Sequence, residues 1–226
     1  MRSQALRRDE LPVNKSGRYR TAHLIEDQFE PGSRSRVLKN LLYIKTRREL
    51  DKAEITALAQ ATDLLVRTYD CKHRFTASDI CYFHKVWLGK IFEWAGNYRQ
   101  VNVSKDNFPF AAARHVPSLM GEFERGLLKK YTPCNFKKKE DIVHALAETH
   151  IELMLIHPFR EGNGRVGRIL ATLMALQARL PLLDFSKIRG KKKQEYFAAV
   201  RAGMDKNYKP MERFFAEIIE KSLSGS

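Results

Sequence analysis

The sequence predicts an all-α domain with one small β-hairpin. Apolar residues recur at steps of three and four over residues 142–156 and again over 166–180, which places them on one face of an α-helix. Only residues 100–115 alternate apolar with polar side chains around a turn candidate, Asp106-Asn107, as a hairpin does.

The other elements follow along the chain. Residues 1–40 are rich in arginine, contain two prolines and two glycines, and show no sustained period, so they are expected to form an irregular N-terminal arm. Residues 41–226 are expected to form one helical domain. Its helices should begin near residue 47 and after Thr76, whose hydroxyl can cap a helix that continues through Ile91 and ends at Gly96. Pro117 should close the hairpin, and further helices are expected at 119–128, 142–156, 164–180, 194–205 and 210–223.

Composition limits the classes of protein. The chain has 226 residues, 43% of them hydrophobic, and so can bury a core. It lacks both the run of about 18 apolar residues of a membrane helix and the apolar region of a signal peptide. Its three cysteines show no CxxC spacing, which argues against a disulfide framework or a zinc knuckle and favours a reducing cytoplasm. The net charge of +15 indicates either attraction to an anionic partner or a basic surface.

Residues 157–168, with the sequence HPFREGNGRVGR, are the candidate active site. Pro158 should end the preceding helix near His157. Gly162, Asn163 and Gly164 come directly before or at the start of the next helix, where free N–H groups and the helix dipole attract anions. Arg165 and Arg168 lie one turn apart, so both guanidinium groups could face one phosphate group.

Two further side chains in this loop have chemistry suited to phosphate transfer. Glu161 offers the oxygen ligands that Mg²⁺ prefers beside a polyphosphate. His157 is suited to act as a general base, because an imidazole with its ordinary pKa of about 6.5 accepts protons at neutral pH.

Other interpretations of these residues remain open. His150 and His157 lie two helical turns apart and could bind a metal, although no HExxH pattern supports this. The basic stretches 137–139 and 189–193 could contact nucleic acid, although no recognition motif accompanies them.

The loop resembles the signature of the Fic family, HxFx[DE]GNGRxxR, at every fixed position. Residues 91–99 and 100–115 resemble the family's segment before its flap and the flap hairpin itself, and the resemblance extends over about residues 25–220. It implies a Fic-type helical domain that transfers AMP from ATP to a Ser, Thr or Tyr hydroxyl of a target protein. Phosphotransfer or de-AMPylation on the same fold is the alternative.

The resemblance also implies roles for individual residues. His157 would be the catalytic base, Glu161 would hold Mg²⁺, and the nucleotide would be bound by Gly162, Asn163, Gly164, Arg165 and Arg168. The flap residues Lys105 and Phe108 are further candidates for the edge of the nucleotide or of the target, which would dock on the flap by strand addition.

Two comparisons with the family concern the reaction and its control. The Doc branch has lysine at the position of Gly164 and transfers phosphate, so glycine favours AMP transfer. The family's inhibitory pattern [ST]xxxE[GN] has no full match; the partial match Ser118 to Glu122 is followed by Phe123. Inhibition is therefore expected to come from a separate antitoxin-like chain or from a degenerate element.

Overall fold

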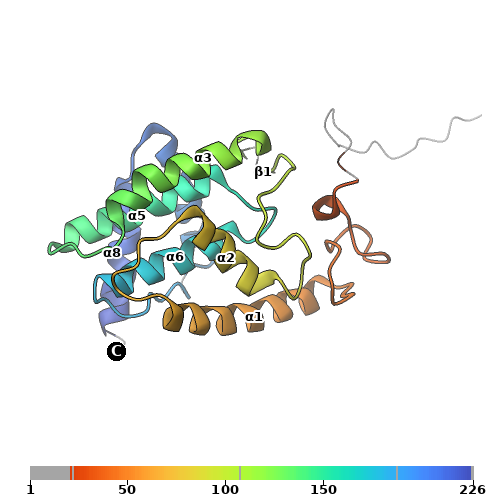
Figure 1. Ribbon diagram of the computed structural model, residues 1–226, viewed down its shortest axis with the longest axis horizontal. Helices are drawn as coiled ribbons and strands as arrows, with labels where there is room; N and C mark the ends of the chain where they lie inside the picture. Colours follow the sequence, from red (N-terminus) through yellow and green to blue (C-terminus); the bar gives the residue numbers. More distant parts are fainter. Residues whose placement is uncertain (1–20, 22, 107, 187, 225–226) are drawn as a thin grey trace, which may run out of the picture.

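The computed structural model describes residues 21, 23–106, 108–186 and 188–224. The predicted all-α fold with one small hairpin is confirmed: two long central helices are surrounded by the others (Figure 1). The elements in order are η1 Ile25–Asp27, α1 Arg47–Thr68, α2 Ala77–Leu88, β1 Ser104–Lys105, β2 Phe108–Pro109, η2 Ala113–His115, α3 Val116–Phe123, η3 Glu124–Leu128, α4 Lys129–Tyr131, α5 Lys139–Ile156, α6 Asn163–Gln177, α7 Gly190–Ala202, η4 Gly203–Asp205 and α8 Lys209–Ser224.

Helices α5 and α6 form the centre of the core. They pack against each other, with α2 against α6, and with α3 and α8 against α5. A Cβ added to Gly167 would lie 2.7 Å from the end of the Met154 side chain and 3.0 Å from the His150 ring, so glycine allows α6 to pack closely on α5 here. The predicted apolar faces are the buried ones, because Leu146, Leu153 and Leu173 are each at most 3% exposed. This packing fixes the loop that joins the two helices.

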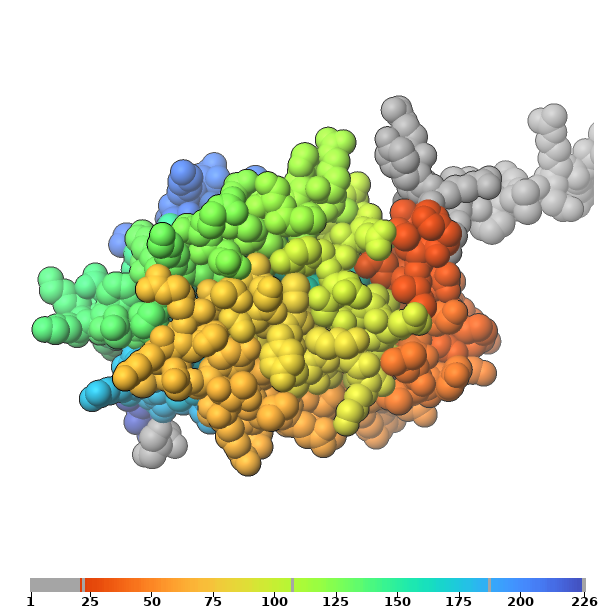
Figure 2. Space-filling model, viewed as in Figure 1, coloured from red at the N-terminus to blue at the C-terminus, as the bar shows by residue number. Residues whose placement is uncertain are grey.

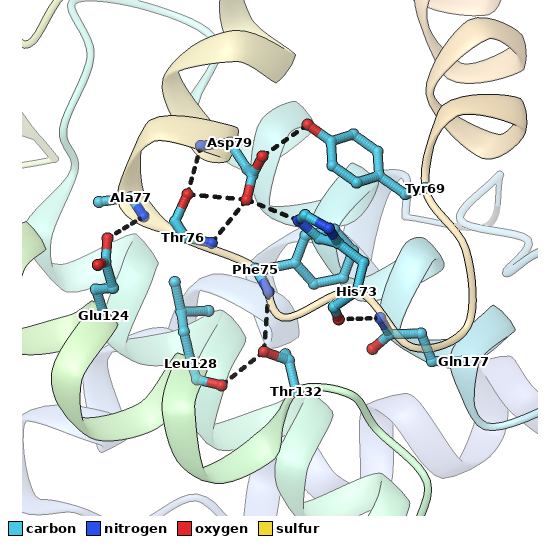
Figure 3. Close-up of polar contacts among 10 residues, drawn as sticks. All are labelled: Tyr69, His73, Phe75, Thr76, Ala77, Asp79, Glu124, Leu128, Thr132 and Gln177. Carbon is cyan, nitrogen blue, oxygen red and sulfur yellow. Dashed lines mark hydrogen bonds and ion pairs between the residues drawn. The ribbon is translucent and has the colours of Figure 1, made fainter.

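Helix α2 starts as predicted and ends earlier than predicted. Thr76 accepts a hydrogen bond from the Asp79 N–H, and Asp79 accepts one from the Thr76 N–H, which makes a capping box. Tyr69 and His73 bond to the same carboxylate, as Figure 3 shows. The helix ends at Leu88, not at Gly96. The apolar residues after it, including Phe92 and Trp94, are buried in consecutive turns, so their spacing reflects burial and not a helix.

The hairpin is present but shorter than the alternating pattern predicts. Its strands pair antiparallel with Ser104 opposite Pro109 and Lys105 opposite Phe108; Asn107, half of the expected turn, lies outside the described residues. Outside these pairs the Phe110 N–H still donates to the Val103 carbonyl at 3.2 Å, and beyond that bond the backbone groups of the two legs bond elsewhere. The Val101 N–H donates to Glu26, and the Ala111 N–H donates to the carbonyl of Leu155. We call residues 100–112 the flap.

Three other boundaries differ from the predictions. Pro117 begins α3 rather than closing the hairpin, as proline suits the first turn of a helix. Helix α6 ends at Gln177, before Pro181, because Arg179 takes a left-handed conformation with φ of 61°. Helix α7 starts at Gly190, four residues before the predicted start, since Lys192 pairs with Glu195 and with Glu217 of α8.

Of the predicted arm, residues 1–20 and 22 lie outside the described residues, and residues 23–40 pack on the domain next to the flap (Figure 2). Val37 is 1% exposed, and Ile25 and Leu38 pack against the core. Within the described residues, no helix is both long and apolar enough to cross a membrane.

Candidate active site

A cavity of about 630 Å³ opens between the flap, the α5–α6 loop and α7. All nine residues that the sequence analysis proposes for the site line this cavity: Lys105, Phe108, His157, Glu161, Gly162, Asn163, Gly164, Arg165 and Arg168. The fold therefore brings together the flap candidates and the loop candidates, which are about 50 residues apart in the chain.

His157 is held at the C-terminal end of α5. It caps the helix in the left-handed conformation, with φ of 53°, and its N–H bonds to the carbonyl of Leu153. Its Nδ1 lies 3.2 Å from the carbonyl oxygen of Met154. Because a carbonyl can only accept, Nδ1 carries the ring proton and Nε2 has the lone pair. The Phe110 ring of the flap stacks on the imidazole at 3.6 Å.

The environment keeps this imidazole neutral. The pKa of His157 is lowered to about 4, chiefly by burial and to a smaller extent by the positive charges of Arg99 and Lys105, against the opposing hydrogen bond to Met154. At neutral pH the side chain is therefore in the form that can accept a proton, at Nε2.

The turn after His157 is closed by Asn163. Its side-chain oxygen accepts from the Phe159 N–H at 2.8 Å, and its amide nitrogen donates to the Phe159 carbonyl at 2.8 Å. Two hydrogen bonds of the Asn163 side chain thus hold the loop, and its backbone N–H is available to an anion. Gly162 precedes the helix with φ of 86°, and a Cβ there would lie 2.6 Å from the Trp87 ring.

The start of α6 offers backbone donors to the cavity. The first N–H groups of a helix have no partner within it, and Asn163 and Gly164 are the first two residues of α6. A Cβ added to Gly164 would meet nothing within 4 Å. This open approach to the backbone suits a phosphate group, which binds well at a helix N-terminus.

Arg165 and Arg168 both line the cavity but have different surroundings. Arg165 pairs with Glu54 of α1 at 2.6 Å and lies 4.4 Å over the Trp87 ring. Arg168 is half-buried, lies 5.9 Å from the Phe185 ring, and forms no ion pair with any described carboxylate. Burial lowers its pKa from a very high ordinary value. The cavity thus contains a guanidinium that lacks an anionic partner among the described residues.

Glu161 is compatible with a divalent cation. It is half-buried, lines the cavity, and its carboxylate makes no hydrogen bond or ion pair with the described residues. No cluster of three or more His, Cys, Asp or Glu residues that could hold a metal occurs in the described chain, so the alternative metal site at His150 and His157 gains no support. A cation at Glu161 would need phosphate oxygens as further ligands, which is the usual mode for Mg²⁺.

Several residues that shape the site were missed by sequence reasoning. The His84 ring of α2 stacks on Phe159 with 3.9 Å between ring centres, and its Nε2 lies 3.1 Å from the carbonyl oxygen of Glu161. Both contacts hold the active-site loop against α2. Glu54 and Trp87 hold Arg165, and Phe197 of α7 lies 3.7 Å beneath the Lys105 ammonium. None of them belongs to a local motif. Their only signal is a polar or aromatic residue in an amphipathic helix, which core residues give equally.

A neutral histidine, a helix N-terminus and a guanidinium without a partner among the described carboxylates line one cavity of a helical domain, an arrangement that suits a phosphate group. Residues 74–175 match the Fic/DOC family model, and this segment is a Fic/DOC domain. The matched segment begins just before α2 and ends within α6, so it contains the flap and the whole α5–α6 loop.

Named relatives and solved structures agree with this assignment. The protein adenylyltransferase VbhT of Bartonella schoenbuchensis is 30% identical over 142 residues, which are 63% of this chain and 29% of VbhT. The "Probable protein adenylyltransferase Fic" of Escherichia coli K12 is 26% identical over 194 residues, 82% of this chain and 89% of the relative.

Among solved structures, an ADP-bound N-terminal Fic domain from Bartonella quintana is 25% identical and superposes with a TM-score of 0.68 over 87% of this chain and 95% of that one. BepC of Bartonella tribocorum, solved with AMPPNP, superposes with a TM-score of 0.69 at 22% identity over 87% of this chain and 97% of BepC, which supports the fold. The chain spans less than two fifths of VbhT and of a similar Fic protein from Nematostella vectensis.

Proposed function

We propose that the protein is a protein adenylyltransferase, which transfers AMP from ATP to a Ser, Thr or Tyr hydroxyl of a target protein. The observation that carries the proposal is the pair formed by His157 and Arg168 on one cavity. A neutral imidazole with a free Nε2 faces the same space as a guanidinium without a described carboxylate partner. The names of the relatives and the ADP bound to the Bartonella quintana domain support the same conclusion.

The proposed reaction is a displacement at the α-phosphorus. Nε2 of His157 takes the proton of the target hydroxyl, and the hydroxyl oxygen forms a bond to the α-phosphorus. The bond between that phosphorus and the oxygen that bridges to the β-phosphate breaks, and pyrophosphate leaves. The N–H groups of Asn163 and Gly164 and the guanidinium groups of Arg165 and Arg168 stabilise the negative charge on the phosphate oxygens.

Glu161 is proposed to hold Mg²⁺, which would neutralise charge on the phosphates. Its unpaired carboxylate on the cavity wall supports this role. The residues of the chain then bind and orient the nucleotide, while Nε2 of His157 accepts the proton.

The flap is proposed to dock an extended segment of the target protein. Ser104 and Lys105 are exposed, and their strand pairs only with β2 in the described chain, so the other edge of β1 can accept a further strand. Lys105 and Phe108 belong to the hairpin and line the cavity, and they are proposed to contact the nucleotide or the target.

Inhibition is proposed to come from a separate antitoxin-like chain. Arg168 pairs with no carboxylate in the described part of this chain, which supports the proposal. The purified protein should then label itself or a target with ATP and Mg²⁺ without an activating substitution. Labelling that appears only after an internal glutamate is replaced would contradict this idea. The cytoplasm is the proposed compartment, in keeping with the three free thiols.

Parallel incubations with α-labelled and γ-labelled ATP test the main proposal. Label retained on protein only from the α position is the expected result, whereas label retained only from the γ position would show phosphotransfer. His157→Ala should abolish labelling and leave ATP binding largely intact. If His157→Ala labels at the wild-type rate, the proposed base is wrong.

A further inference from the structure

The C-terminal end of α5 is where the flap and His157 meet. The last four carbonyls of a helix have no partner within it, and here each finds a different donor. The carbonyl of Leu153 accepts from the His157 N–H, and that of Met154 accepts from the His157 ring. The carbonyl of Leu155 accepts from the Ala111 N–H of the flap, and that of Ile156 accepts from Arg99.

Arg99 has the largest share of these contacts. Its Nε donates to the carbonyl of His157 at 2.6 Å, and its Nη2 donates to that of Ile156 at 3.3 Å. The same guanidinium donates to both legs of the flap: from Nη1 to the Val101 carbonyl at 2.8 Å, and from Nη2 to the Ala111 carbonyl. One side chain, 2% exposed, therefore joins the helix end to both ends of the flap.

Glu26 of the arm also bonds to this junction, through both its side chain and its backbone. Glu26 is 5% exposed, and its carboxylate accepts from the N–H groups of Gln100 at 2.6 Å and Val101 at 3.0 Å. Its carbonyl accepts from Arg160 of the active-site loop at 3.1 Å. Figure 2 shows this arm segment, coloured red to orange, against the yellow-green flap residues. The negative charge of Glu26 also acts on Arg99.

The choice of arginine here follows from its shape. A guanidinium has five N–H donors in a fixed fork, so it can bond to four carbonyls at once, whereas a lysine ammonium has three donors. A cation also interacts favourably with the negative end of the α5 dipole. Burial lowers the pKa of Arg99 to about 10, so the group stays charged at neutral pH.

We propose that Arg99 is a positioning residue, which fixes the His157 imidazole and the flap relative to each other so that a target held by the flap meets Nε2. Arg99 does not line the cavity, so it acts only through the backbone at residues 101, 111, 156 and 157. This inference rests on the proposed function, because it assigns a purpose to the geometry of the proposed base.

The test compares Arg99→Lys with the control Arg114→Lys, in which an exposed arginine after the flap is replaced. A two-bond ¹H–¹⁵N imidazole spectrum reports the tautomer of His157, whose signals are assigned by their loss in His157→Ala. In the wild type and the control, His157 should show one tautomer with the proton on Nδ1. In Arg99→Lys it should show exchange between tautomers, and the buried His84 and His150 should keep their signals. These NMR signals do not depend on catalysis, so they test the positioning role of Arg99 even if adenylyl transfer is not the reaction.

Activity supplies the second readout. In Arg99→Lys the rate of labelling at saturating ATP should fall on the order of 10–100-fold, since a misplacement of about 1 Å can cost that much. The Kd of ATP should change less than about threefold. The milder variant Glu26→Gln, which keeps a hydrogen-bond acceptor at the junction, should lower the same rate to a smaller extent. An unchanged tautomer with an unchanged rate, or a rate loss matched by loss of ATP binding, would overturn the positioning role.

Discussion

The carboxylate of Glu54 and the guanidinium of Arg165 form an ion pair at 2.6 Å between α1 and the start of α6. The Glu54 side chain is 3% exposed and that of Arg165 is 24% exposed. The backbone carbonyl of Glu54 also accepts from the indole N–H of Trp87, whose ring lies under the same guanidinium. One residue of α1 thus fixes both the arginine and the aromatic surface on which it rests.

Replacing Glu54 with glutamine should lower the free energy of unfolding by about 1–3 kcal/mol, because a hydrogen bond to a charged group is lost or weakened in a buried place. Urea denaturation measures this loss. The control is Glu93→Gln, an exposed glutamate whose loss should change stability by less than about 0.5 kcal/mol. Equal effects of the two substitutions would show that the ion pair contributes little.

Gly162→Ala should destabilise the protein and Gly164→Ala should not. At Gly162 alanine meets both a left-handed φ of 86° and the Trp87 ring at 2.6 Å, whereas at Gly164 a methyl group enters open space in a helix. We expect a loss of about 1–3 kcal/mol for the first variant and a change within about 0.5 kcal/mol for the second. Thermal unfolding without nucleotide measures the stability of the two variants. A larger loss for Gly164→Ala than for Gly162→Ala would refute this account of the turn.

The imidazole of His157 should remain neutral well below pH 6.5. Its pKa in the folded protein is lowered to about 4, chiefly by burial, so the unfolded chain binds this proton more readily. The stability contributed by the neutral imidazole is present above pH 6.5 and is lost as the pH falls through 4. An NMR titration of the His157 Cε1–H should show no step between pH 8 and 5.5. In urea the imidazoles should titrate near about 6.5, and such a step in the folded protein would contradict the burial argument.

Asp79→Ala should cost about 2 kcal/mol of stability, because it removes the capping box of α2 and leaves His73 and Tyr69 without their partner (Figure 3). Burial alone would raise the pKa of Asp79, but hydrogen bonds from His73, Tyr69 and Thr76 hold it below its usual value. The contribution of Asp79 is therefore present above about pH 4 and fades as the pH falls further. The control is Asp63→Ala, which removes an exposed pair with Arg67 and should cost less than about 1 kcal/mol in the same urea titration.

The loop candidates could be predicted from the sequence because they are neighbours in the chain. The helical period located α5 and α6, Pro158 located the end of α5, and the glycines located the next helix start. What could not be predicted depends on contacts between distant segments. Arg99 reaches residues 156 and 157, Glu54 reaches Arg165, and His84 supports Glu161. A single sequence contains no spacing that encodes such pairs.

The errors in element boundaries have the same origin. The apolar residues after Leu88 predict a continued helix, but Phe92 and Trp94 lie in a segment of turns and are buried there. The alternating pattern predicts longer strands in the hairpin, but the N–H groups of Val101 and Ala111 donate to Glu26 and to the end of α5. Their carbonyls accept from Arg99. In each case burial or a tertiary hydrogen bond, and not the local sequence pattern, determines the backbone conformation.

The guanidinium of Arg168, which pairs with no carboxylate among the described residues, would link the folding of the protein to the proposed nucleotide ligand. An anion that binds this site only in the folded state stabilises it by RT ln(1 + [L]/Kd), which is about 2.7 kcal/mol at a concentration of 100 times Kd. The melting temperature should therefore rise with the nucleotide concentration of the surrounding solution. With ATP as the proposed ligand, the chain should be most stable where ATP is plentiful and most prone to unfold where ATP is depleted.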